Sequence, residues 1–338
     1  MANALYSIRN LSVEYATRRG VVDAVNDVSL DIRPGEVLGL VGESGCGKST
    51  LGMALMRLIR PPGRITSGEL WFDGKDLMTF SKRQMRNLRG KRIGMIFQDP
   101  MTSLNPVQRI VDHLTEAILA HGVEFSKATA RERSEALVDR LGIRKERIDD
   151  YPHQLSGGMR QRVMISLALA LQADLIIADE ATTSLDVIVE AQFLDLLREL
   201  RDEFNLTIIL VTHNIGVVAE LADRVAVMYA GRLAEVGSVY DIFARPMHPY
   251  TYGLLQSVPS IQLGEKDQLY KMPGEPPSLM SPPTGCRYHP RCPEVMEICS
   301  SITPDFVNHS EKQFAACWLY EDHPEKAIAS LNGSKYAQ

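Results

Sequence analysis

Hydrophobic positions along the chain alternate between short apolar runs and stretches with helical spacing. Apolar runs typical of buried parallel strands occur at residues 37–41, 93–97, 175–178 and 206–211. Between them, apolar residues recur three or four positions apart, as in residues 51–59. Strands that alternate with helices predict an α/β fold, whose ligands bind at the carboxyl ends of the parallel strands.

Two regions depart from this alternation. Residues 5–32 have strand patterns in succession and predict an antiparallel β subdomain, whereas residues 107–148 are helical throughout and predict a helical insertion. We assign the helical subdomain to about residues 100–165. The proline-rich C-terminal part is predicted to be rich in loops. We therefore expect one domain over residues 1–255 and a C-terminal extension over residues 256–338.

Composition places the chain among ordinary water-soluble globular proteins. It has 338 residues, 45% hydrophobic and 23% charged residues, and a net charge of −5, which gives no support to nucleic-acid binding. The longest nearly apolar stretch, residues 163–171, is far shorter than the ~20 residues of a membrane helix. There is no N-terminal leader pattern, so we expect a cytosolic chain that is able to dock on a membrane protein.

A phosphate-binding loop is predicted between the first apolar strand and the helix after it. The segment has the pattern G-x-x-x-x-G-K-S, in which glycines let backbone N–H groups surround phosphate oxygens. Lys48 is expected to reach the β- and γ-phosphates, and the Ser49 hydroxyl to bind Mg²⁺. The candidate phosphate-binding residues are Gly42, Glu43, Ser44, Gly45, Cys46, Gly47, Lys48, Ser49 and Thr50.

Polar residues follow three of the other apolar strands. Gln98 is a candidate for Mg²⁺ or the attacking water, Asp179 for Mg²⁺, and Glu180 for accepting a proton from that water. His213 is a candidate contact of the γ-phosphate, and Tyr15 is a candidate for stacking on a purine. Each has a structural alternative: solvated or loop-capping polar residues, and a half-buried strand tyrosine.

A second anion site is predicted at the start of another helix. Ser156 is a good N-cap, and Gly157 and Gly158 leave the first N–H groups of the helix accessible. The alternative is an ordinary helix cap with a spare glycine.

These motifs together resemble those of ABC-transporter ATPase subunits, over about residues 5–240. The motifs, in order, are Tyr15, the loop 42–50, Gln98, LSGGM at 155–159, LIIADE at 175–180, SLD at 184–186 and His213. The resemblance implies a P-loop NTPase core and a head-to-tail dimer, in which ATP lies between one chain's loop and the other chain's LSGGM. It also implies that Tyr15 stacks on adenine, that Glu180 is the general base and that His213 senses the γ-phosphate. Ser156, Gly157 and Gly158 would then serve the partner's ATP.

The C-terminal part narrows the resemblance to the ATP-binding subunits of dipeptide and oligopeptide permeases. RPMHPYT at 245–251, FQDPMTSLNP at 97–106 and YPHQLSGGM at 151–159 are similar to that group. Such a subunit would hydrolyse ATP at the cytoplasmic face of the membrane as a peripheral protein. Its partners would be two transmembrane permease subunits, an extracytoplasmic substrate-binding protein and a second ATPase subunit, which is often a paralogue.

Three alternatives and two departures accompany this assignment. Nickel or oligosaccharide import, a soluble ABC ATPase acting on DNA or ribosomes, and a redox-sensing ATPase share parts of the pattern. The second is disfavoured because the chain has a single nucleotide cassette and no sustained heptads. Ala181 stands where the family usually has proline, and Asn214 where it usually has aspartate. Neither change removes a catalytic group.

Four cysteines crowd into the last 53 residues, at Cys286, Cys292, Cys299 and Cys317. Four thiolates suit either tetrahedral zinc or a [4Fe–4S] cluster, and a third possibility is that they bind no metal. Structural zinc usually has tight C-x₂₋₄-C pairs, which are missing here, so the spacing favours the cluster. The resemblance also implies a cluster, since some peptide-permease subunits carry one. We therefore predict a small, loop-rich C-terminal metal-binding domain.

Overall fold

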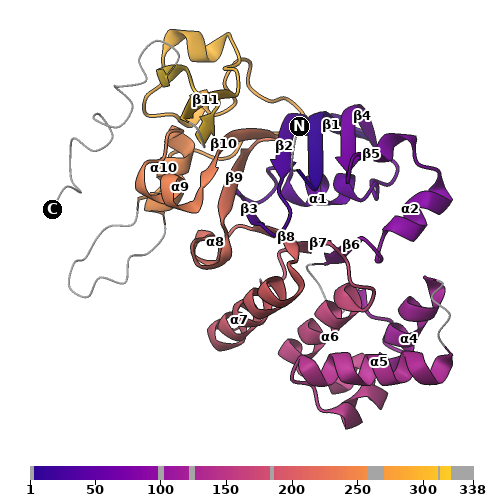
Figure 1. Cartoon of the computed structure of the whole chain (residues 1–338). Helices are drawn as coiled ribbons and strands as arrows, with labels where there is room; N and C mark the ends of the chain where they lie inside the picture. The colour runs from indigo at the N-terminus through magenta and orange to yellow at the C-terminus, as the bar shows by residue number, and fades with distance from the viewer. Residues whose placement is uncertain are drawn as a thin grey trace, which may run out of the picture. The chain divides into compact units, whose positions relative to one another are not determined.

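The structure, a computed structural model, contains two compact units (Figure 1). It describes residues 4–97, 103–121, 126–182, 186–257, 270–310 and 313–320. Unit 1 comprises residues 1–5, 32–37 and 72–211. Unit 2 comprises residues 6–31, 38–71 and 212–338.

Unit 1 contains three parallel strands whose residues are buried throughout. They are β6 (Ile93–Ile96), β7 (Leu175–Asp179) and β8 (Thr207–Thr212), with β7 in the middle. Ile93 pairs with Leu175, and Asp179 pairs with Val211. A parallel strand covered on both faces needs a continuous apolar sequence, which is the reason that these runs were recognisable.

The helices of unit 1 include a cluster that the sequence predicted as an insertion. Helices α4 (Ile110–Ala120), α5 (Lys127–Arg140) and α6 (Gly157–Leu169) pack against one another (Figure 1). Ile110, Leu114 and Ile118 are buried on one face of α4, at the spacing of an amphipathic helix. The unit also contains α2 (Lys82–Leu88), α7 (Val187–Phe204), the short strand β5 (Lys75–Asp76) and 3₁₀ turns η1 (Leu77–Thr79), η2 (Lys145–Asp149) and η3 (Pro152–Gln154).

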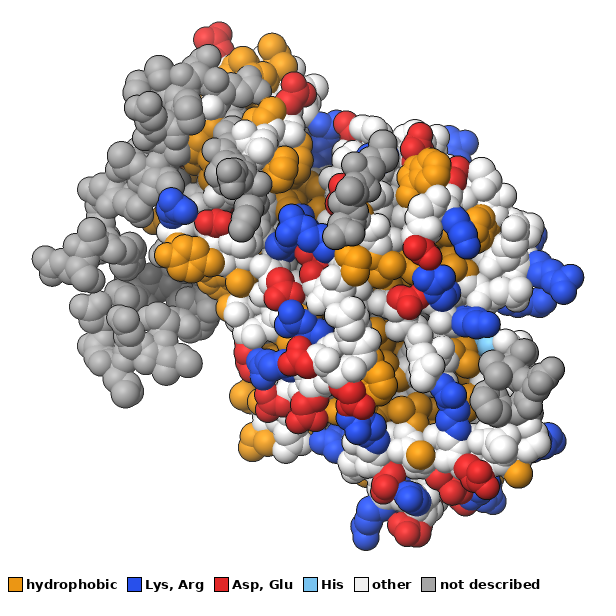
Figure 2. Space-filling view, in the orientation of Figure 1, with side chains coloured by type: hydrophobic (Ala, Val, Ile, Leu, Met, Phe, Trp, Pro, Cys, Tyr) orange, Lys and Arg blue, Asp and Glu red, His pale blue; other side chains and the backbone are white. Residues whose placement is uncertain are grey.

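Ion pairs cover the outside of this helical cluster. Arg131 on α5 binds Asp149 at 2.6 Å and Glu135 at 2.7 Å. Basic and acidic side chains are accordingly interspersed over the lower part of the face in Figure 2. These groups are substantially exposed, so each pair stabilises the cluster only slightly.

Unit 2 begins with strands that form the predicted β subdomain. β1 (Tyr6–Thr17) and β2 (Gly20–Ile32) are adjacent and joined by two residues, so they run antiparallel; β4 (Gly63–Phe72) lies on the other side of β1. Tyr6, Ile8, Leu11 and Val13 are fully buried. The alternation of buried and partly exposed residues in β1 indicates one face on the core and one toward solvent.

A second sheet of unit 2 joins the early strand β3 (Val37–Val41) to the C-terminal end of the chain. β3 is parallel to β9 (Arg224–Tyr229), which is antiparallel to β10 (Arg232–Ser238). β10 pairs with β12 (Gln313–Ala315), and β12 with β11 (Val307–Ser310), both antiparallel. The C-terminal part therefore extends the same sheet that carries β3. The helices are α1 (Lys48–Leu55), α8 (Ile215–Leu221), α9 (Val239–Ala244) and α10 (Pro249–Gln256), with 3₁₀ turns η4 (His289–Arg291), η5 (Glu297–Ser300) and η6 (Trp318–Tyr320).

Within the described ranges, none of the helices has both the length and the apolar character that spanning a bilayer requires.

Glu235 on β10 connects three segments of unit 2. Its buried carboxylate accepts hydrogen bonds from the backbone N–H groups of Met247 and His248 (2.8 and 2.9 Å) and from the Gln313 amide (2.8 Å). Burial raises the pKa of Glu235, and the N–H donors act against that rise. The side chain thereby ties the start of α10 and the last strand to β10.

Because of His248, we expect the free energy of unfolding of unit 2 to decrease at acidic pH. Its ring is buried, and Nδ1 accepts a hydrogen bond from the Tyr250 N–H at 3.0 Å, which caps α10. Burial lowers the pKa of His248 to about 4. The unfolded chain takes up this proton near pH 6.5, so the contribution of neutral His248 is present above that pH and is lost as the pH falls toward 4. Over this pH range, the free energy of unfolding lost through His248 is about 3 kcal/mol in total.

The measurement is the free energy of urea unfolding between pH 4 and 7 for the native protein and His248→Asn. Asparagine keeps an N-capping acceptor without a titrating ring. We expect the native protein to lose more stability than the variant over this range. Glu235 and Tyr288, two titratable groups that contact His248, are present in both proteins, so the comparison isolates the titration of His248. Equal slopes would show that His248 does not titrate as described.

Candidate functional site

The loop between β3 and α1 has a conformation that only glycine permits at its centre. Gly45 and Gly47 have φ of +79° and +105°, in the left-handed region. A Cβ on Gly47 would lie 2.1 Å from the carbonyl oxygen of Ala24. The loop turns tightly into α1, whose N-cap, Gly47, makes no side-chain cap. The first N–H groups of α1 therefore have no side-chain acceptor at the cap and suit an anion.

Lys48 is held inside this loop by backbone carbonyl groups. The side chain is 4% exposed, and its Nζ donates to the carbonyl oxygens of Gly42 (2.8 Å) and Glu43 (3.0 Å). Two neutral acceptors only partly replace the water around a buried ammonium group, so an anionic ligand beside Nζ would be strongly favoured. Cys46 is buried in the loop, and burial raises the pKa of its thiol.

Two carboxylates lie at the carboxyl end of β7 in unit 1. Asp179 ends the strand and is buried. Glu180 is partly buried, has φ of +46°, and donates its backbone N–H to the Val211 carbonyl at 2.8 Å. A glutamate in the left-handed region is strained, and strained residues of this kind cluster at functional sites. Carboxylate oxygens such as those of Asp179 are a ligand type that Mg²⁺ prefers.

At the predicted second anion site the structure has the start of a helix, α6, with the side-chain N-cap that the sequence indicated. Ser156 Oγ accepts a hydrogen bond from the Met159 N–H at 3.3 Å, and α6 follows. A Cβ on Gly158 would lie 2.8 Å from a methyl group of Val189 on α7, whereas the position of Gly157 is open. On the same helix, buried Gln161 donates to the Ala181 carbonyl, just after Glu180. This contact, which the sequence reasoning missed, links the LSGGM helix to the turn that holds Glu180.

The remaining predicted residues occupy separate places. Tyr15 on β1 is partly buried, and its ring packs against Gly63, where a Cβ would lie 2.5 Å from the ring. His213 is exposed just after β8. Asn214 caps α8 by accepting from the Gly216 N–H at 3.0 Å, which gives this departure from the family pattern a structural role. Gln98, like residues 184 and 185, lies outside the described residues.

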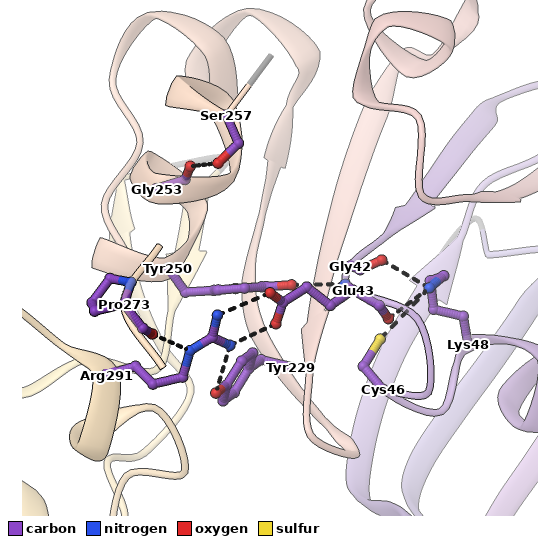
Figure 3. A network of polar contacts seen from close by, with 10 residues as sticks. All are labelled: Gly42, Glu43, Cys46, Lys48, Tyr229, Tyr250, Gly253, Ser257, Pro273 and Arg291. Atoms are coloured by element: carbon purple, nitrogen blue, oxygen red, sulfur yellow. Dashed lines mark hydrogen bonds and ion pairs between the residues drawn. The ribbon is translucent and has the colours of Figure 1, made fainter. Parts of the chain in front are cut away.

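The predicted site residues thus divide between the units. Unit 2 carries Tyr15, the loop 42–50 and His213, and unit 1 carries residues 156–158, 179 and 180. Within unit 2 the structure adds residues that the sequence reasoning assigned no role. Tyr250 and Arg291 both contact Glu43 of the loop (Figure 3). The RPMHPYT motif contained Tyr250, but its spacing alone did not indicate a contact more than 200 positions away.

The predicted [4Fe–4S] cluster is wrong, as is its zinc alternative. All four C-terminal cysteines are described and are free thiols. In the described part of the chain, no group of three or more His, Cys, Asp and Glu side chains is arranged to hold a metal ion. Burial raises the pKa of Cys286 and Cys317, and that of Cys292 to about 12.

The predicted C-terminal metal-binding domain is corrected with it. The spacing of cysteines along the chain does not determine whether their sulfur atoms converge. Non-covalent contacts hold this part instead: β12 pairs with β10, Arg287 pairs with Asp23, and Tyr288 packs edge-on to Tyr229 with ring centroids 5.2 Å apart. These contacts supply the order that the prediction attributed to a metal.

Comparisons with known proteins agree with two predictions from the sequence: the ABC-transporter motifs and the peptide-permease character of the C-terminal region. A family model described as ABC transporter matches residues 25–183, and one described as oligopeptide/dipeptide transporter, C-terminal region, matches residues 234–299. The dipeptide transport ATP-binding protein DppD of Bacillus subtilis is 46% identical, over 96% of this chain and 97% of its own length. The oligopeptide transport ATP-binding protein OppD of Salmonella typhimurium is 48% identical, over 90% of each chain.

Solved structures share the fold of the nucleotide-binding part. A dimeric structure of MJ0796, a bacterial ABC transporter cassette, is 26% identical with a TM-score of 0.63 and covers 69% of this chain and 98% of that chain. CbiO1 of Clostridium perfringens, part of the ABC transporter complex cbiONQ, is 29% identical with a TM-score of 0.62 and covers 72% and 92%. The P-loop ABC ATPase fold predicted from the sequence is therefore confirmed.

Proposed function

Because this chain belongs to the family of ATP-binding subunits of dipeptide and oligopeptide ABC transporters, we propose that its loop 42–50 binds the phosphates of ATP. The chain is the ATPase of an importer for dipeptides or oligopeptides and hydrolyses ATP to drive transport. Nickel or oligosaccharide import and a soluble redox-sensing role are not favoured, since relatives 44–48% identical to this chain are named for dipeptide or oligopeptide transport. The observation that carries the assignment of the site is the buried ammonium group of Lys48 inside a loop that only glycine can form.

The roles of the other residues follow from their chemistry and position. Glu180 accepts a proton from the attacking water, at the end of β7, and His213 contacts the γ-phosphate. Tyr15 stacks on the adenine, and Gln98 orients the water or binds Mg²⁺. Ser49 and Asp179 supply further oxygen ligands for Mg²⁺, which neutralises phosphate charge when bound.

The start of α6 serves an ATP molecule bound by a second ATPase subunit. Ser156, Gly157 and Gly158 present N–H groups at the positive end of the helix dipole, which suits a γ-phosphate. We propose that this second subunit is a paralogue. Mass spectrometry of the transporter purified through this chain tests that: two different ATP-binding chains support it, whereas a single kind contradicts it.

Permease subunits in the membrane and a substrate-binding protein complete the importer. The chain works at the cytoplasmic face of the membrane, as a peripheral subunit, with a nucleotide-binding domain over residues 1–255 and a C-terminal extension over 256–338. Proteoliposomes that contain the assembled transporter test the substrate class. Uptake of a labelled dipeptide or oligopeptide that requires ATP inside supports it, and uptake of nickel or an oligosaccharide instead contradicts it.

Replacement of Lys48 by alanine tests the phosphate site. A hydrogen bond from a charged group is worth about 1.5–3 kcal/mol, so Lys48→Ala is expected to weaken ATP binding roughly 10- to 150-fold. Titration of the purified full chain with a fluorescent ATP analogue and Mg²⁺ measures this. Lys75→Ala, at an exposed lysine of β5, is the control and should bind as the native chain does. Unchanged binding in Lys48→Ala would refute the assignment of the loop.

A further inference from the structure

Glu43 of the phosphate-binding loop is bound to two residues from the later part of the chain, Tyr250 and Arg291. Its carboxylate receives two hydrogen bonds from Arg291, from Nη1 at 2.7 Å and Nη2 at 3.0 Å (Figure 3). Its backbone N–H donates to the hydroxyl group of Tyr250 at 2.8 Å. Both the side chain and the backbone of Glu43 are therefore fixed by residues that lie more than 200 positions later in the sequence.

Arg291 is itself held in one orientation. Its Nε donates to the Pro273 carbonyl at 2.8 Å, and Nη1 also donates to the Tyr229 hydroxyl at 3.2 Å. The guanidinium carbon lies 5.8 Å from the centre of the Tyr229 ring and 6.0 Å from that of Tyr288. The side chain of Arg291 is 5% exposed. A buried, bidentate arginine–carboxylate pair fixes direction as well as distance.

On the other side of Glu43, the same residue holds the phosphate-binding lysine. The Glu43 carbonyl oxygen accepts from Lys48 Nζ at 3.0 Å and from the Cys46 N–H at 3.3 Å. Arg291 therefore binds the side-chain carboxylate of Glu43, and Lys48 binds the backbone carbonyl group of the same residue. A change in the position of Glu43 moves the carbonyl group that orients Lys48.

We propose that Arg291, with Tyr250 of α10, is a positioning residue of the ATP site, and that the C-terminal extension sets the affinity of the loop for ATP through Arg291. This inference rests on the proposed function of the loop 42–50. Arg291 does not touch ATP in this proposal; it acts through Glu43. The extension is then a required part of the nucleotide site, and its displacement lowers ATP affinity.

The test compares two buried arginines of the same extension. Arg291→Met removes the pair with Glu43, whereas Arg287→Met removes an equally buried pair with Asp23; the arginines are 5% and 9% exposed and both acids are 21% exposed. Titration of each full-length variant with the fluorescent ATP analogue and Mg²⁺ gives affinity, and thermal unfolding gives stability. We expect both variants to lose stability, but only Arg291→Met to bind ATP about 5- to 30-fold more weakly.

Conservative variants separate positioning from a merely structural role. Arg291→Lys keeps the charge without the bidentate geometry and should recover part of the affinity. Glu43→Gln should weaken binding as well, and Glu43→Gln combined with Arg291→Met should be no weaker than Arg291→Met alone, since both remove one interaction. If Arg291→Met does not fold, Arg291→Lys and Glu43→Gln provide the same comparison with Arg287→Met.

The outcomes distinguish this inference from the proposed function. Native ATP affinity in Arg291→Met, or an equal loss in Arg287→Met, overturns the positioning role while weak binding by Lys48→Ala still supports the loop. Native affinity in Lys48→Ala overturns the proposed function itself. Additive effects of Glu43→Gln and Arg291→Met would also overturn the positioning role, because the two residues would then act independently.

Discussion

Glu180→Gln is expected to bind ATP with native affinity and to hydrolyse it about 10²- to 10⁴-fold more slowly, the range that general acid–base catalysis contributes. The amide has the shape of the carboxylate but cannot accept the proton of the attacking water. The strained backbone of Glu180, with φ of +46°, and its N–H bond to Val211 hold the side chain at the end of β7. Glutamine tolerates that conformation about as well as glutamate, so the fold should be unaffected.

ATP turnover by the assembled transporter, measured as phosphate release at saturating ATP, tests this expectation. Asp195→Asn makes the matched change in an exposed carboxylate of α7 and should leave turnover within about two-fold, as is usual for surface changes. A rate for Glu180→Gln within ten-fold of the native rate would show that another group takes the proton. A loss of ATP binding would show that Glu180 acts in binding rather than in proton transfer.

Glu235→Ala is expected to cost about 2–6 kcal/mol of the free energy of unfolding of unit 2. Truncation leaves the N–H groups of Met247 and His248 buried without their acceptor, at about 1–3 kcal/mol each. The Gln313 amide loses one acceptor but keeps its hydrogen bond to the Arg245 carbonyl at 2.9 Å. A loss of this size is a large fraction of the stability of a typical domain. Glu235→Gln retains the volume and one carbonyl oxygen and should cost less.

Urea unfolding followed by tryptophan fluorescence measures this loss. Trp318 lies in η6, next to the last strand, and Trp71 lies in β4; both are in unit 2. Glu297→Gln, at an exposed acid of the same region, is the control and should change stability by no more than about 0.5 kcal/mol. A loss below about 1 kcal/mol in Glu235→Ala would mean that water or another group replaces the carboxylate.

The wrong prediction about the cysteines shows where pattern reasoning fails. A phosphate-binding loop is continuous in sequence, so its spacing determines its geometry. The cysteines lie on separate loops and turns, and spacing cannot show whether their thiols converge or are buried as neutral groups. The contacts that do hold the extension come from Arg287, Arg291 and Tyr288. An arginine in a loop or a 3₁₀ turn is not part of a periodic sequence pattern. The sequence therefore does not reveal which residues it contacts.

The sequence by itself determined the local features of this protein. Continuous apolar runs predicted β3, β6, β7 and β8, the glycines around Lys48 predicted the loop, and Ser156 predicted the cap of α6, because each depends on neighbours within a few residues. Only the tertiary structure decided what lies against these features. The strained Glu180, the contact of Gln161 with Ala181 and the hold of Arg291 on Glu43 arise where distant segments pack together, and their geometry is set by burial and hydrogen bonding in three dimensions.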